Sequence, residues 1–221
     1  MEYWREYRTY FHIATNWGVS ESTICRIVID IESTLMKTGK FRLTGKKALL
    51  KNSDYPAVVA LDVTETAIER PKKNRKDIIQ ARRNVIPSKL NWSLIKRQEQ
   101  LFALLLGKDI ATILACLKKV KFLHHPETDS LQDSGYQGIK DYHLNSYIPR
   151  KKPKNGKLSL LEKEYNRTLA QERIVIEHVN RSLKIFKILS SRYRNRRRRY
   201  GLRCNLLSAI YNYELALGGL N

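Results

Sequence analysis

Three acidic side chains are placed where phosphodiester chemistry could use them. Asp62 ends a short β-branched run, residues 58–63, that predicts a buried strand. Asp133 precedes a glycine-rich turn, and Glu177 lies within a long predicted helix. Hard divalent cations prefer carboxylate oxygens, and a pair of such ions can activate an attacking oxygen and stabilise the leaving one. The three acids are therefore candidate catalytic residues and metal ligands.

Each acid also has an ordinary structural interpretation. Asp62 could cap the turn that follows the predicted strand. Glu177 is flanked at helical spacing by Arg173 and Arg181, so it could form ion pairs on a solvated helix face. Taken alone, each residue favours the ordinary interpretation, and only the three together in a basic chain favour a catalytic set.

The composition indicates a polyanionic partner. Among 221 residues, 42 are Lys or Arg and 21 are Asp or Glu, a formal net charge of +21. Such a charge repels itself unless a polyanion shares the surface, which favours nucleic acid, with an acidic membrane leaflet as the other candidate. The length predicts one domain, or one domain with a small appendage.

Neither membrane insertion nor export is predicted. The longest apolar run, residues 101–106, is far shorter than the roughly 20 residues that a spanning helix needs. The first ten residues alternate charged and aromatic side chains and lack the apolar core of a secretory signal. Cys25, Cys116 and Cys204 have no paired spacing, which indicates reduced thiols. We therefore expect a cytoplasmic protein with no membrane partner.

An arginine-rich run near the carboxyl end is a candidate nucleic-acid contact. Seven arginines fall within residues 192–203, with Tyr193 and Tyr200 between them. A solvated charge run is the alternative, but clustered guanidinium groups repel one another unless phosphates neutralise them. The candidate contacts in this run are Arg192, Arg194, Arg196, Arg197, Arg198 and Arg199.

The first 40 residues predict two helices joined by a tight turn. Gly18 interrupts the first helical pattern, and Ser20 is a good N-cap for the second. This arrangement fits a helix-turn-helix whose second helix offers Ser22, Thr23 and Arg26 to DNA. A plain helical hairpin is the alternative. The apolar stripe expected to face the core is Ile24, Ile27, Val28, Ile31 and Leu35.

Four segments resemble the transposases of bacterial insertion sequences in the DDE superfamily, in the branch with a helix-turn-helix ahead of a ribonuclease-H-like catalytic domain. The segments are EYWREYRTYFHIATNWGVSESTICRIV, VVALDVTETAIERPKK, LQDSGYQGI and residues 165–215. The resemblance implies an α/β fold, with a DNA-binding region at residues 1–45 and a catalytic domain at residues 54–221.

The resemblance also implies roles for individual residues. The first Asp, the second Asp and the Glu of the family map onto Asp62, Asp133 and Glu177, which would hold two Mg²⁺ ions. Arg173 and Lys184, and with them Arg181, are expected to contact the transposon end, although Ala170 stands where a related signature has Tyr. The implied partners are double-stranded DNA, as element ends and as target, and further copies of the chain on that DNA. A nucleoid-associated location follows.

The chain departs from the family in two places. It begins inside the expected N-terminal helical region, so we expect a truncated N-terminus. Residues 77–121 do not match the family, and the Leu-rich run at 101–117 predicts a short buried helix. If residues 77–82 are written with permitted codons, the same nucleotides translated in a shifted reading frame give Tyr-Tyr-Ser-Gly-Lys. That peptide matches the sequence of the family at this place. We therefore expect an out-of-frame central segment.

This interpretation predicts damage to the catalytic fold. A ribonuclease-H-like sheet needs the two strands that should follow Asp62, and their loss would leave the early sheet incomplete and the chain an inactive remnant. The alternatives are a DNA-binding protein that competes for element ends without cutting them, and a basic RNA-binding protein.

Overall fold

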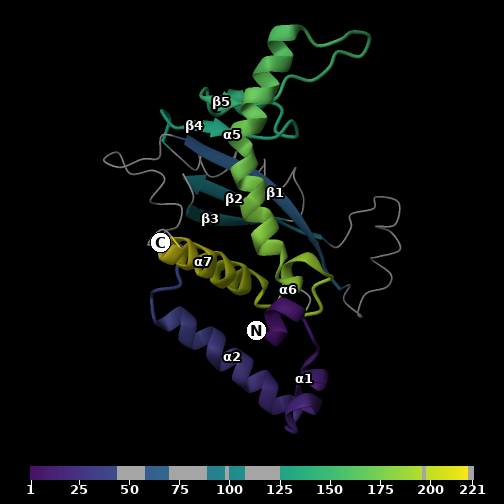
Figure 1. Ribbon diagram of the computed structural model, residues 1–221, viewed down its shortest axis with the longest axis vertical. Helices are drawn as coiled ribbons and strands as arrows, with labels where there is room; N and C mark the ends of the chain where they lie inside the picture. Colours follow the sequence, from purple (N-terminus) through teal and green to yellow (C-terminus); the bar gives the residue numbers. More distant parts are fainter. Residues whose placement is uncertain (44–57, 70–88, 98–99, 108–124, 196–197, 219–221) are drawn as a thin grey trace. The chain divides into compact units, whose positions relative to one another are not determined.

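The computed structural model describes residues 1–43, 58–69, 89–97, 100–107, 125–195 and 198–218 (Figure 1). The chain forms two compact units. The helical unit comprises Met1–Arg42, Glu65–Leu90 and Arg181–Asn221, and the sheet unit comprises Leu43–Thr64 and Asn91–Asn180. No helix in the described ranges is long and apolar enough to cross a membrane.

A five-stranded mixed sheet forms the centre of the sheet unit, in the order β3-β2-β1-β4-β5. β4 pairs in parallel with β1 on one side and with β5 on the other, whereas β2 and β3 are antiparallel. The parallel pairs confirm the α/β class expected from the sequence. The strands are β1 (Val58–Ala67), β2 (Lys89–Arg97), β3 (Gln100–Gly107), β4 (Asp129–Leu131) and β5 (Ser146–Tyr147).

The strands β2 and β3 correct the expectation that the early sheet is lost. Their ladder runs from the Asn91–Gly107 pair to the Arg97–Gln100 pair, with one register shift. The predicted helix over the Leu-rich run is therefore wrong for residues 101–107. A short apolar run fits a buried helix and a buried strand equally well in sequence, and pairing with a neighbour decides between them. The rest of the 77–121 segment lies outside the described residues.

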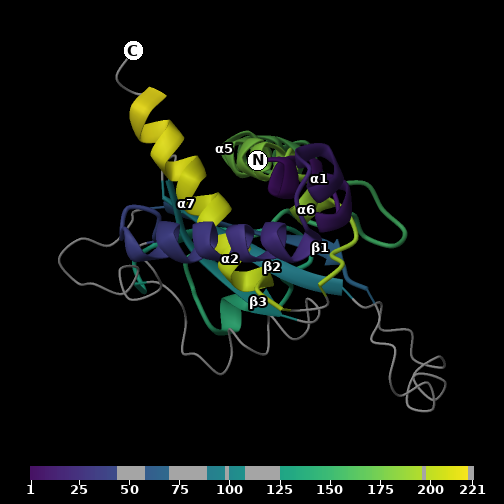
Figure 2. The same ribbon diagram turned by 90° about the horizontal axis from the view of Figure 1, so that it is seen from below.

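One long helix, α5 (Leu160–Lys184), crosses the strands in Figure 1 and is seen nearly end-on, to one side of them, in Figure 2. Its start is a capping box, in which the Ser159 hydroxyl accepts from the Glu162 amide at 3.1 Å and the Glu162 carboxylate accepts from the Ser159 amide at 2.9 Å. This pair fixes the point at which α5 begins. Leu169, Ile176 and Val179 recur at helical spacing and are buried, so this stripe fixes which face of α5 turns inward.

The helical unit contains the predicted helix-turn-helix pair. The Ser20 hydroxyl accepts from the Thr23 amide, and Gly18 adopts the left-handed conformation at φ 62° that ends the first helix. Residues from both ends of the chain share this unit. Its helices are η1 (Glu2–Glu6), α1 (Tyr10–Trp17), α2 (Glu21–Lys37), α6 (Lys187–Ser190) and α7 (Tyr200–Gly218).

The inward face of α2 differs from the predicted apolar stripe. Ile24 is buried, but Ile27 is 46% exposed and Ile31 is 52% exposed. Glu32 is fully buried instead, and it accepts hydrogen bonds from Arg199 and Arg203 at 2.6 Å each. An acid is stable in this position only because cations and donors surround it. Both cations come from residues more than 160 positions away in sequence, and the Trp4 indole N–H donates to the same carboxylate at 3.3 Å.

Candidate active site

Asp62 lies on β1, and Asp133 follows the end of the neighbouring parallel strand β4 by two residues. Ala60 of β1 pairs with Leu131 of β4, and each aspartate follows its paired residue by two positions. Both aspartates are therefore offset by two positions from the last residue pair of this ladder, Asp62 still within β1 and Asp133 just beyond β4. The strand pairing thus brings together two acids that are 71 positions apart in the sequence.

A guanidinium group stands between the two carboxylates. Arg173 of α5 places Nη2 4.0 Å from Asp62 Oδ1 and Nη1 3.8 Å from Asp133 Oδ1. The Arg173 side chain is only 12% exposed, and Asp62 is 24% exposed, whereas Asp133 is 57% exposed. Two carboxylates therefore share one positive charge, with one carboxylate open to solvent.

The carboxylate of Asp62 has a second partner on α5. The Asn180 side-chain amide donates to Asp62 Oδ2, the oxygen opposite the one that faces Arg173. Asn180 is buried, at 6% exposure. Asn180 was not among the site residues predicted from the sequence. Its spacing of seven positions from Arg173 places it two turns further along the same helix face, and that was the signal that could have found it.

Glu177 lies between these two residues on α5. It follows Arg173 by four positions and precedes Asn180 by three, so it shares the helix face that contacts Asp62. Its side chain is exposed. Within the described residues, no three His, Cys, Asp or Glu side chains gather closely enough to hold a metal ion.

The donor chemistry nevertheless fits a divalent cation. The acids offer only carboxylate oxygens, which Mg²⁺ prefers, and the position between Asp62 and Asp133 already accommodates a positive charge. Glu177 is the third carboxylate on the adjoining helix face.

The predicted nucleic-acid contacts fall into exposed and internally bonded groups. Arg194 donates to the Tyr7 carbonyl, and Arg199 pairs with Glu32. The Thr23 hydroxyl lies 2.8 Å from the Ser20 hydroxyl. Arg196 and Arg197 lie outside the described residues. The exposed members of the set are Ser22, Arg26, Arg181, Lys184, Arg192 and Arg198.

Comparison with known proteins identifies the family. Residues 108–212 match the model of the DDE superfamily endonuclease, and residues 1–41 match the helix-turn-helix of DDE superfamily endonucleases. The chain is also 48% identical over 217 residues to a probable transposase for insertion sequence element IS702 from Microchaete diplosiphon, covering 98% of this chain and 79% of the relative. The chain belongs to the DDE-superfamily transposases of insertion sequences.

Membership in this transposase family fixes several general properties. DDE superfamily endonucleases depend on divalent metal ions, and the matched helix-turn-helix implies DNA binding. The alignment with the IS702 transposase covers 98% of the chain, so it takes in most of residues 77–121. No solved structure matches the transposase chain significantly.

Proposed function

We propose that this transposase cuts and joins DNA at the ends of its insertion sequence, with Asp62, Asp133 and Glu177 as the catalytic set on a ribonuclease-H-like fold. The observation that carries the proposal is the cation shared by Asp62, which lies on β1, and Asp133, which lies two residues beyond the end of the parallel strand β4. The sheet order β3-β2-β1-β4-β5 supports the fold assignment.

The three acids would hold Mg²⁺, in the two-ion arrangement that phosphodiester chemistry favours. Bound ions would supply activation of the attacking oxygen and stabilisation of the leaving oxygen. Asn180 holds the Asp62 carboxylate in one orientation through its side-chain amide. Arg173 supplies positive charge between Asp62 and Asp133 and, when released from them, can pair with a DNA phosphate.

The proposed reaction has two steps. Water attacks the phosphorus at the element end, the P–O3′ bond breaks, and a 3′-hydroxyl and a 5′-phosphate remain. That 3′-hydroxyl then attacks a phosphodiester of target DNA, which forms one new bond and releases a target 3′-hydroxyl. We place the transposase in the cytoplasm, associated with the nucleoid, and acting as a homo-oligomer that holds element ends and target together.

A protein that binds element ends without cutting them is the second candidate function. It is favoured by the geometry of the acids, since no three acidic or other metal-binding side chains of the described residues lie close together. The sequence predicted an inactive chain because the two strands after Asp62 were expected to be lost. The strands β2 and β3 are present in the sheet, so this ground for inactivity is weaker.

A nicking assay on DNA that carries the element ends distinguishes between the two proposed functions. The purified transposase should nick this DNA in Mg²⁺, and Asp62→Asn, Asp133→Asn and Glu177→Gln should each abolish nicking while leaving DNA binding intact. Glu172→Gln is the matched control, because Glu172 is another exposed acid on α5. Binding without nicking would support the competitor, and nicking by a chain repaired in residues 77–121 would then assign the defect to that segment. Undiminished nicking by all three variants would overturn the catalytic assignment.

A further inference from the structure

A cavity in the helical unit has a wall built largely of arginines. Its volume is about 320 Å³, and it lies where α1 and α2 meet the arginine-rich segment. The helices α1 and α2 contribute Tyr10, Cys25 and Ile29 to its lining. The carboxyl-terminal part of the chain contributes Arg194, Asn195, Arg198, Arg199 and Arg203.

These arginines carry more charge than the surrounding residues neutralise. Glu32 pairs with Arg199 and Arg203, each at 2.6 Å. Arg194 instead stacks on the Tyr7 ring at 4.0 Å, and in the described part of the chain neither it nor Arg198 forms an ion pair with a carboxylate. Of the four arginines that line the cavity, only two are therefore paired with a carboxylate in the described part of the chain. Clustered like charges repel one another strongly unless an anion joins them.

Arg199 has two features typical of a functional position. Its backbone lies in the left-handed region at φ 59°, which side chains other than glycine rarely adopt. Its Nη2 atom is buried and has no hydrogen-bond partner within the described structure. A buried donor without an acceptor is uncommon in folded proteins, and a bound anion is one way to satisfy it.

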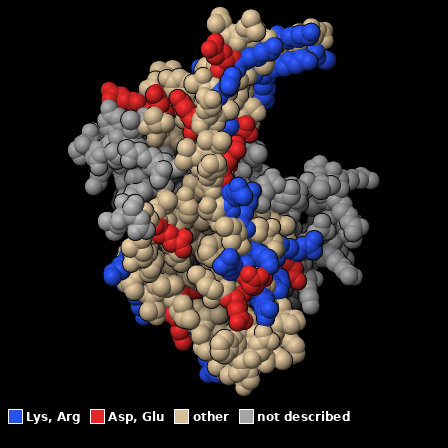
Figure 3. All heavy atoms as spheres, in the orientation of Figure 1, with Lys and Arg blue, Asp and Glu red and all other residues tan. Residues whose placement is uncertain are grey.

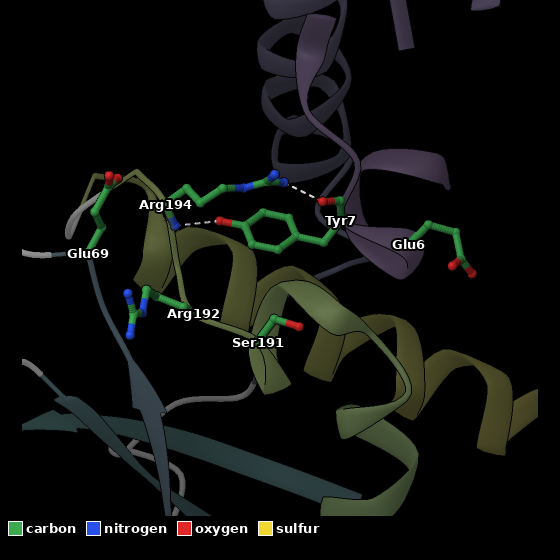
Figure 4. A pocket seen from close by; sticks show the side chains of 6 residues that line it. All are labelled: Glu6, Tyr7, Glu69, Ser191, Arg192 and Arg194. Atoms are coloured by element: carbon green, nitrogen blue, oxygen red, sulfur yellow. Dashed lines mark hydrogen bonds between the residues drawn. The ribbon is translucent and has the colours of Figure 1, made fainter. Parts of the chain in front are cut away.

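A neighbouring cavity of the helical unit is also lined by arginines but has acids in its wall. Its volume is about 390 Å³, and Arg192 and Arg194 share its wall with Glu6 and Glu69 (Figure 4). The lining of that cavity therefore includes acids, one of which, Glu6, pairs with Lys187 at 2.7 Å. The described residues that line the cavity beside α2 include no Asp or Glu.

The arginine-lined cavity lies next to the face of α2 that the helix-turn-helix offers to DNA. Ile29 in its wall follows the exposed Arg26 by three positions, and the exposed Ser22 precedes Arg26 by four. Residues at these spacings are neighbours on a helix surface. A DNA strand that borders the groove entered by α2 would therefore run beside the cavity.

We propose that this cavity binds a phosphate group of the DNA backbone and thereby fixes α2 on its site. The inference rests on the proposed DNA-binding function and adds a specific phosphate contact to it. Arg198 and Arg199 are the binding residues, because Arg198 is exposed with no carboxylate partner in the described chain and Arg199 has the unsatisfied donor.

Cys25 provides a reporter inside the cavity. It is half-buried and in its reduced form, whereas Cys204 is buried and its pKa is raised to about 12 by burial, so Cys204 reacts slowly with alkylating reagents. In a Cys116→Ser background, the alkylation rate of Cys25 should fall severalfold when duplex DNA with the element ends is bound. A parallel experiment with inorganic phosphate in place of DNA shows whether a free anion is enough to protect Cys25.

Arg198→Gln should remove this protection. It should also make the plot of log K against log salt less steep by about 0.9, the value for one phosphate contact. Lys37→Gln, which removes the same charge from the exposed end of α2, should leave Cys25 protection unchanged. Circular dichroism of both variants checks folding.

Protection by DNA, with or without protection by inorganic phosphate, supports the site. Unchanged Cys25 reactivity in a chain that still binds DNA would overturn this site and leave the proposed function standing, as would full protection in Arg198→Gln. Protection by inorganic phosphate alone would overturn the DNA assignment. Failure of the unmodified transposase to bind DNA would instead overturn the proposed function.

Discussion

The two carboxylate oxygens of Asp62 have different partners, and both partners come from α5. Oδ1 lies 4.0 Å from the Arg173 guanidinium, and Oδ2 accepts from the Asn180 amide. A carboxylate held on both sides loses little rotational freedom when it meets a metal ion or a substrate, so much of its orientation is set by the fold. Asn180 is therefore a positioning residue for Asp62.

Asn180→Ala should slow metal-dependent nicking while DNA affinity stays unchanged. Without the amide, the Asp62 carboxylate can rotate away from Asp133, and loss of a supporting hydrogen bond of this kind typically costs about 10- to 100-fold. Single-turnover nicking at several Mg²⁺ concentrations measures the effect, which should include a weaker apparent affinity for the metal. His178→Ala changes an exposed neighbour on the same helix and serves as control. An unchanged metal requirement in Asn180→Ala would show that the contact is structural only.

Arg173→Gln should strengthen binding of divalent ions in the absence of DNA. The substitution removes a positive charge within 4.0 Å of both carboxylates, and such a charge opposes a second cation in the same place. The exposure of Asp133 screens the effect, so we expect a gain of about threefold to tenfold rather than more. Titration with Mn²⁺, followed by its electron paramagnetic resonance signal, measures this directly. Equal or weaker binding would mean that Arg173 does not compete with the ion.

Only part of the site could be predicted from single residues. Asp62 and Asp133 were predicted as members of one acidic set, and the structure brings both to the same guanidinium group. That group belongs to Arg173, which the resemblance implied as a contact of the transposon end and not as a partner of the two aspartates. Asn180 was not predicted, because an amide on a helix has many ordinary roles. The internal partners of Arg194 and Arg199 were also hidden, since Tyr7 and Glu32 lie far away in the sequence.

At the scale of elements, the largest difference from the sequence-based expectation is the presence of the strands β2 and β3. A Leu-rich run carries no periodicity that separates a buried strand from a buried helix, so only the pairing with a neighbour revealed the β-structure. The elements with local signals were predicted well. Ser20 caps α2 as expected, because a cap depends on residues within one helical turn, and Ser159 caps α5 in the same way.

The loop before α5 concentrates five exposed cations within the sheet unit, and Lys and Arg side chains gather there in Figure 3. They are Arg150, Lys151, Lys152, Lys154 and Lys157. The base of the loop is held to α5, because the Asn166 side chain accepts from the Arg150 amide at 2.7 Å and donates to its carbonyl at 3.0 Å. A rigidly based basic loop suits contact with a DNA backbone.

Changing the four lysines of this loop to Gln should weaken DNA binding and make it less sensitive to salt. Each lost phosphate contact lowers the log–log salt slope by about 0.9, so the slope should fall by up to about 4 if all four lysines contact phosphate. Fluorescence anisotropy at several salt concentrations gives the slope. The thermal midpoint should not change, because these side chains are exposed. An unaltered slope would show that the loop is only a solvated surface.

At the scale of the whole molecule, the two ends of the chain share one unit. The fully buried Arg203 of α7 pairs with the fully buried Glu32 of α2 and donates to the hydroxyl groups of Tyr3 and Tyr193. Removal of one partner from such a buried pair typically costs about 3–5 kcal/mol, because the other charge stays buried alone. The helix-turn-helix therefore depends on the carboxyl-terminal segment for its stability, a dependence that local sequence patterns do not contain.

The helical unit should lose stability in alkaline solution. Burial raises the pKa of the Cys204 thiol from 9.0 to about 12, and burial also raises the pKa of Tyr200. A group with a raised folded-state pKa contributes its full stability below its unfolded pKa and loses it as pH rises toward the folded value. The free energy of unfolding should thus fall between about pH 9 and pH 12, by up to a few kcal/mol for the thiol.

Urea unfolding at pH 8 and pH 10.5 tests this expectation. Cys204→Ala should reduce the loss between the two pH values, and Cys25→Ala, at a half-buried position, is the control. The same loss in Cys204→Ala as in the unmodified chain would assign the alkaline sensitivity to other groups.

The central claim is that Asp62, Asp133 and Glu177 act together around shared cations. Iron-directed cleavage of the polypeptide tests this even in a chain that does not cut DNA. Fe²⁺ replaces Mg²⁺, ascorbate and peroxide generate hydroxyl radicals at the bound ion, and the backbone breaks nearby. We predict fragments that end near residues 62, 133 and 177, all suppressed by excess Mg²⁺ and all lost together in Asp62→Asn. Breaks at only one of these places, or breaks that persist in Asp62→Asn, would contradict the claim.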